Sequence, residues 1–195
     1  MDRKISFEQY RTIDLTILLI VLGFCQYLTY AASNFWFPDQ LYVVSPVAAM
    51  VTLIMMRWNG YAAIHALLGG LLFTALSGGN AQQYVIYGVG NLCGLAALVM
   101  LKLFGKEKVR QDSFLSLTFA LLTQILMQLG RAAVAALFHY PAAACIGFIT
   151  TDALSAIFTL FVIWIVRRIE GLFEDQKNYL LRIQREQKVE RGEQI

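Results

Sequence analysis

Residues 58–101 read WNGYAAIHALLGGLLFTALSGGNAQQYVIYGVGNLCGLAALVML, and this stretch contains no Asp, Glu, Lys or Arg. A helix needs about 20 apolar residues to cross the hydrocarbon core of a bilayer, and the stretch is about twice that long. Small and polar residues interrupt it near the middle, at Ser77, Gly78, Gly79 and Asn80, as is typical of a turn. The stretch therefore predicts two membrane-spanning helices joined by a short loop.

Similar segments without formal charge flank this stretch, at residues 15–38, 40–56, 113–130 and 132–151. Over the whole chain of 195 residues, 58% are hydrophobic and only 15% are charged, whereas a soluble domain carries about a quarter charged residues. We therefore expect an all-α integral membrane protein built as a bundle of six transmembrane helices. The expected helices cover residues 15–32, 41–56, 61–76, 83–103, 114–138 and 142–166.

The distribution of basic residues predicts the orientation of this bundle. Of the 16 Lys and Arg residues, all except Arg131 precede the first expected helix, follow the last, or lie in loops on the same side. Cytoplasmic loops carry the excess of positive charge in membrane proteins. We therefore expect both termini in the cytoplasm and a multi-pass protein of the bacterial cytoplasmic (inner) membrane. The net charge of +3 then reflects topology and does not indicate a nucleic-acid partner.

The composition changes after the sixth expected helix, which predicts a transmembrane domain at residues 1–167 and a charged cytoplasmic tail at residues 168–195. Apolar residues recur in the tail at helical spacing, which predicts an amphipathic helix. Such a helix could continue the last transmembrane helix into water, lie on the membrane, or pack on a partner protein. The residues on its apolar face are Ile169, Leu172, Phe173, Leu180 and Ile183.

Two charged residues, Arg131 and Asp152, fall inside expected transmembrane helices. A charge at bilayer depth costs free energy and should face the protein interior or a wet cavity. Polar residues at helical spacing accompany both charges and form three stripes: Tyr84, Tyr87 and Asn91; Gln124, Gln128 and Arg131; Asp152, Ser155 and Thr159. Because lipid cannot satisfy polar groups, the three stripes should point inward and together line a pocket that opens to the outside.

Two interpretations of the charges remain open. Arg131 and Asp152 could form an ion pair that only joins two helices, or Arg131 could bind an anionic or carbonyl group of a ligand while Asp152 orients it. Trp36 lies in the first outer loop, either as part of an interfacial aromatic belt or as a lid over the pocket. The candidate substrate-binding residues are Arg131, Asp152, Gln128, Asn91, Tyr84, Tyr87 and Trp36.

Motifs of catalysis are missing from the sequence. It contains no phosphate-binding Walker A loop, no HExxH, no GxSxG and no acidic cluster with metal-ligand spacing. We therefore expect no enzymatic activity, no bound metal and no cofactor.

Three short runs resemble the substrate-binding S components of energy-coupling factor (ECF) transporters. They are MRWNGYAA at residues 56–63, LGGL at residues 68–71 and YGVGNL at residues 87–92. The resemblance covers roughly residues 12–167. It implies uptake of a vitamin or another micronutrient, captured in an outward-facing pocket between helices 4 to 6 and capped by the first outer loop. It also implies a coupling membrane protein with two ATPase subunits as the partner.

A different class of function is the main alternative. The rod-shape-determining membrane protein MreD is similar in size and helix arrangement, and a protein of that kind would be a scaffold without a substrate. A pure scaffold has less need for charges inside the membrane, so Arg131 and Asp152 favour the transport interpretation.

Overall fold

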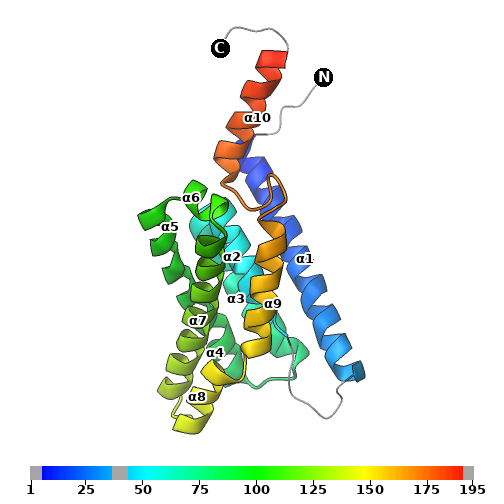
Figure 1. Ribbon diagram of the computed structural model, residues 1–195. Coiled ribbons are helices and arrows are strands. Elements are labelled where there is room, and N and C mark those ends of the chain that lie inside the picture. The colour runs from blue at the N-terminus through cyan, green and yellow to red at the C-terminus, as the bar shows by residue number, and fades with distance from the viewer. Residues whose placement is uncertain (1–5, 37–43, 191–195) are drawn as a thin grey trace.

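The computed structural model describes residues 6–36 and 44–190, and within these ranges every regular element is helical (Figure 1). Two 3₁₀ turns, η1 (Asn59–Tyr61) and η2 (Cys93–Ala97), interrupt the helical order. The helices are α1 (Phe7–Trp36), α2 (Val47–Trp58), α3 (Ala62–Leu76), α4 (Ala81–Leu92), α5 (Leu98–Phe104), α6 (Lys106–Gln111), α7 (Ser113–Leu137), α8 (Ala142–Thr150), α9 (Ala153–Val166) and α10 (Gln176–Glu190).

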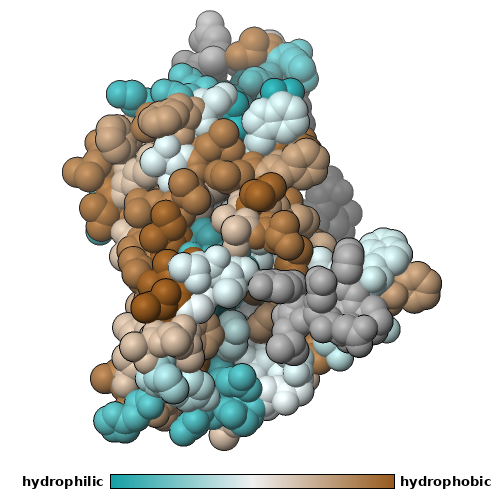
Figure 2. Space-filling model, turned by 60° about the horizontal axis from the view of Figure 1, so that its bottom comes forward, coloured by the Kyte–Doolittle hydropathy of each residue, from teal (hydrophilic) through white to brown (hydrophobic). Residues whose placement is uncertain are grey.

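Five of the helical stretches are long and apolar enough to cross a membrane, which confirms the prediction of an all-α chain of the multi-pass type. Large apolar side chains are exposed along most of them, and Figure 2 shows apolar surface between two more polar regions. The five stretches are Phe7–Trp36, Val47–Leu76, Ala81–Phe104, Ser113–Leu137 and Ala142–Val166.

The stretch Val47–Leu76 folds back on itself at η1. Asn59 adopts a positive φ of 54°, and the chain reverses direction there. As a result the start of α2 lies beside the middle of α3: a Cβ atom on Gly69 would stand 3.0 Å from the side chain of Val47. Every residue of α2 except Met50 is buried. A helix that is apolar all round belongs in the middle of a bundle, and α2 occupies that place.

The bundle has two distinct ends. We call the end with α6, α10 and the start of α1 the tail end, and the opposite end, with the α3–α4 and α7–α8 turns, the loop end (Figure 1). The side chain of Asn80 caps α4 at the loop end by accepting a hydrogen bond from the Gln83 backbone N–H. The Gln83 side chain accepts from the Asn80 backbone N–H, which completes a capping box.

The segment between α9 and α10 corrects the tail prediction. Residues 167–175 form a series of turns, so Ile169, Leu172 and Phe173 do not share a helical face with Leu180. α9 ends at Val166, and Gly171 adopts a φ of 74°, a conformation that favours glycine and is incompatible with a right-handed helix. Phe173 is only 1% exposed and belongs to the core of the bundle. The domain boundary at residue 167 stays a prediction, but the first part of the tail is packed against the helices.

Arg57 connects this turn segment to the bundle. Its guanidinium donates to both carboxylate oxygens of Asp14 in α1, at 3.0 and 2.6 Å, and to the backbone carbonyls of Gly171 and Leu172, at 2.7 and 3.0 Å. The indole of Trp58 donates to the same carboxylate. Bidentate arginine–carboxylate pairs are among the strong charge-assisted hydrogen bonds, so this cluster ties α1, α2 and the tail together.

A second set of ion pairs joins the tail to α6. Lys106 contacts Asp175 at 2.6 Å, and Arg110 contacts Glu174 at 3.2 Å. Burial lowers the pKa of Lys106, and the hydrogen bond and charge of Asp175 act against that shift. The loop between α5 and α7 is therefore held to the segment that follows α9.

Candidate substrate-binding site

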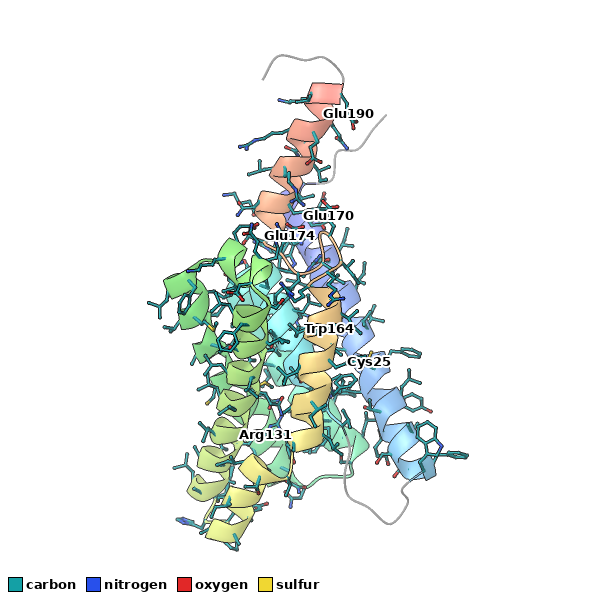
Figure 3. All side chains as sticks on the ribbon, viewed as in Figure 1. Cys25, Arg131, Trp164, Glu170, Glu174 and Glu190 are labelled. Carbon is teal, nitrogen blue, oxygen red and sulfur yellow. The ribbon has the colours of Figure 1, made fainter. Side chains whose placement is uncertain are left out.

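Arg131 lies inside the bundle, on α7 and nearer the loop end (Figure 3). Its side chain is buried and makes two hydrogen bonds to other parts of the bundle. Nε donates to Oδ1 of Asn91 on α4 at 2.7 Å, and Nη1 donates to Oδ2 of Asp152 at 3.2 Å. Asn91 in turn donates to the carbonyl of Ala66 on α3 at 3.1 Å. Residues from three separate helical stretches therefore fix the guanidinium.

Asp152 receives its hydrogen bonds on one oxygen only. Gln124 lies seven residues before Arg131 on the same face of α7. It donates to Oδ2 at 2.9 Å, the same oxygen that Arg131 contacts. Within residues 6–36 and 44–190, Oδ1 of Asp152 and Nη2 of Arg131 have no hydrogen-bond partner. The Asp152 side chain is 19% exposed. The pair therefore keeps one unused acceptor, Oδ1, and one unused donor group, Nη2.

Asp152 stands at a break in the helix, not inside one. The expected continuous helix over residues 142–166 is wrong in this respect, because α8 ends at Thr150 and α9 begins at Ala153. The hydroxyls of Thr150 and Thr151 bond back to the carbonyls of Ile146 and Gly147, at 3.2 and 2.7 Å. Such back-bonding bends helices, and here it precedes the break. The Asp152 carboxylate does not cap α9, since Gln124 and Arg131 engage it instead.

Tyr87 forms one wall of the site. The Arg131 guanidinium lies 5.0 Å from the centroid of its ring, within the range of a cation–π contact. Phe73 and Phe148 pack against the same ring, with centroid distances of 4.9 and 5.8 Å. Sequence reasoning missed Phe148, because nothing distinguishes it from the other apolar residues of α8.

The remaining members of the predicted stripes are buried. Gln128 lies on the same face of α7 as Arg131 but has no side-chain hydrogen bond within the described ranges. Ser155 accepts from the backbone N–H of Ser45 at 3.0 Å and joins α9 to the segment before α2. The hydroxyl of Thr159 is buried without a partner among the described residues. All three stripes therefore point inward, except at Tyr84.

Tyr84 and Trp36 lie away from Arg131. Tyr84 lines an apolar cavity of about 410 Å³ between α1 and α3, together with residues such as Leu19 and Leu72. Trp36 is 68% exposed at the end of α1 and packs on Phe35. The loop that would form a lid extends into residues 37–43, which lie outside the described ranges. Trp36 and Tyr84 both stay predictions as site residues.

The charges at the centre of the site balance. Arg131 and Asp152 carry opposite charges, and Asn91, Gln124 and Gln128 are neutral. Such a site suits a ligand group that offers an acceptor and a donor together, because the free Nη2 donates while the free Oδ1 accepts. Within the described part of the chain, no three His, Cys, Asp or Glu side chains gather closely enough to hold a metal ion.

Comparisons with known proteins give no family: no protein-family model, no curated protein and no solved structure matches this chain.

Proposed function

We propose that this chain is the membrane-embedded substrate-binding subunit of an ECF-type uptake transporter for a vitamin or another micronutrient. In this proposal the small molecule enters from outside the cell and binds between α4, α7 and the α8–α9 break. The chain binds the substrate and performs no chemistry on it.

The observation that carries the proposal is the Arg131–Asp152 pair at the helix break. Charged residues inside apolar helices are expensive and mark ligand or ion pathways in membrane proteins. Irregular backbone at membrane depth is tolerated where it is buried in protein or lines a cavity, and transporters place their substrates at such broken helices. The unused Nη2 of Arg131 and Oδ1 of Asp152 supply the polar contacts that a substrate needs.

The proposal includes six crossings, with both termini in the cytoplasm of a bacterial cell. The reversal at η1 supports it, because α2 and α3 lie side by side and divide Val47–Leu76 into two passes. The distribution of basic residues supports the orientation, with Arg57, Lys106 and Arg110 at the tail end.

Cysteine labelling tests the orientation in a variant without Cys25, Cys93 and Cys145. A cysteine at the exposed residue 108 should react with an impermeant reagent only after the cells are opened. A cysteine at residue 139, in the α7–α8 turn, should react in intact cells. The reverse pattern would overturn the topology.

The proposed partner is a coupling membrane protein with two ATPase subunits. The sequence contains no Walker A loop, so in this proposal the ATPase subunits of the partner supply the energy for uptake.

Mass spectrometry of small molecules that co-purify with the protein tests the proposed function directly. We expect one compound to be enriched in the wild-type protein and absent from Arg131→Gln. Arg185→Gln, in the exposed part of α10, is the matched control and should retain the compound. A folded wild-type protein that carries no small molecule and captures no ATPase would favour a scaffold of the MreD kind instead.

A further inference from the structure

A cavity of about 310 Å³ lies at the tail end, far from Arg131 along the bundle. It is formed where the α2–α3 turn meets α5 and the start of α6. Its lining residues are Asn59, Gly60, Leu98, Leu101, Lys102 and Lys106. The substrate-binding site proposed above uses none of them.

The polar side of this cavity carries an excess of positive charge. Lys106 is paired with Asp175 at 2.6 Å. Lys102 has no ion pair within the described parts of the chain, and Glu107, the nearest acidic residue in sequence, is engaged by Arg110 at 2.6 Å. Two ammonium groups therefore line the cavity against one carboxylate, and an anion would balance the charge.

The other side of the cavity is apolar and continues onto the outer surface of α5. Leu98 and Leu101 form the wall. On the outside of the same short helix, Val99, Leu103 and Phe104 are exposed, Leu103 to 74%. Figure 1 places α5 at the periphery of the bundle, at the level of α6. A molecule bound in the cavity would therefore meet lysine side chains at one end and the apolar surface of α5 at the other, and this surface suits a hydrocarbon chain.

We propose that this cavity binds the head group of an anionic phospholipid. Lys102 and Lys106 contact the phosphate, and the acyl chains run along Val99 and Leu103. Basic pockets between helices on the cytoplasmic side of membrane proteins bind such head groups, while the apolar path distinguishes a lipid from free phosphate.

Titration of the purified full chain in detergent tests the proposal, with bound lipid counted by native mass spectrometry. The probes are phosphatidylglycerol, phosphatidylcholine and inorganic phosphate. Phosphatidylglycerol should bind in preference to phosphatidylcholine. Lys102→Gln should weaken this binding about fivefold, as expected for the loss of one lysine near a lipid head group. Lys106 is left unchanged, because its ion pair with Asp175 also holds the tail.

Lys108→Gln is the matched control. Lys108 belongs to the same loop and is exposed, but it lies over the ring of Phe104, at 5.9 Å, and does not line the cavity. It should bind phosphatidylglycerol as the wild type does. Equal weakening by both variants would mean diffuse surface attraction and would overturn the proposal. So would equal binding of the two lipids, or displacement of the lipid by inorganic phosphate at similar concentration, which would identify a soluble anion as the ligand.

Discussion

Gly130 on α7 lies directly against the backbone of Gly90 on α4: a Cβ atom on Gly130 would stand 2.2 Å from the Gly90 carbonyl oxygen. Gly90 is also tightly packed, since a Cβ atom there would stand 2.7 Å from Cα of Arg131. Small residues allow helices in a membrane to approach in this way. The contact places Arg131 beside Asn91, each being the next residue along its helix, and so it sets the position of the site.

Gly130→Ala should therefore disturb the fold and the site together. The added methyl group meets backbone and the side chain of Cys93, which cannot move far, and overpacking of this kind costs about 1–3 kcal/mol. We expect a lower melting temperature and loss of the co-purified ligand. Gly147→Ala is the matched control, because a Cβ atom there meets nothing within 4 Å. Equal melting temperatures for the two variants would contradict the close packing of α4 and α7.

Arg131→Gln and the double variant Arg131→Gln with Asp152→Asn separate the structural role of the pair from its binding role. The single variant leaves the Asp152 carboxylate with Gln124 alone. Loss of one partner from a fully buried pair costs about 3–5 kcal/mol, and the 19% exposure of Asp152 reduces this to roughly 2 kcal/mol. The double variant removes the stranded charge and should recover most of the stability.

Ligand retention, measured alongside thermal unfolding, completes this comparison. Both variants should lose the ligand, because both lack the free donor of Arg131. A double variant that is as stable as the wild type and still retains the compound would leave the pair with a structural role only.

Arg57→Gln should destabilise the tail end more than Asp14→Asn does. Without Arg57, the Asp14 carboxylate keeps only the indole of Trp58, the carbonyl of Leu172 loses its donor, and the carbonyl of Gly171 keeps only Gln176. We expect a loss of about 3 kcal/mol from this nearly buried pair. Limited proteolysis should release α10 faster in Arg57→Gln, whereas Arg185→Gln should be cut at the wild-type rate. Equal cleavage of the wild type, Arg57→Gln and Arg185→Gln would mean that the cluster does not hold the tail.

Two truncations test how far the folded unit extends. A chain that ends at residue 185 keeps Phe173, Gln176 and the ion pairs of Arg182, so its melting temperature should stay close to that of the full chain. A chain that ends at residue 168 loses the buried Phe173 and the carbonyls that Arg57 contacts. Removal of a buried Phe side chain alone costs about 3–5 kcal/mol. This shorter chain should aggregate on extraction, and a monodisperse product of normal stability would place the tail outside the folded unit.

The periodicity of the sequence predicted the inward polar stripes, because lipid leaves polar groups no other place. It left an Arg131–Asp152 ion pair as one of two interpretations. It could not predict the break at Asp152. No Pro or Gly marks residues 150–152, and the signal is a pair of threonines whose hydroxyls bond back along the helix. Tyr84 stays a prediction as a site residue, because it lines the cavity between α1 and α3.

The tail shows the same limit of periodicity. Ile169, Leu172 and Phe173 have helical spacing, yet α9 ends at Val166 and Gly171 adopts a positive φ between them. Of the three, only Phe173 is buried, and Ile169 is half exposed. The direction of the chain depends on contacts with Arg57, which is distant in the sequence.

The Asp14–Arg57 ion pair also determines how α1 can move. Asp14 and Tyr10, which donates to Gln176 at 2.9 Å, attach α1 to the bundle at one end, and Gln26 bonds to the carbonyl of Gly69 at 2.9 Å further along. Beyond Gln26 most large side chains of α1 are exposed, and Figure 1 shows the helix leaning away from α9 toward the loop end. These contacts hold the part of α1 that carries Tyr10, Asp14 and Gln26, so any displacement of the helix should be largest at its other end, at Trp36.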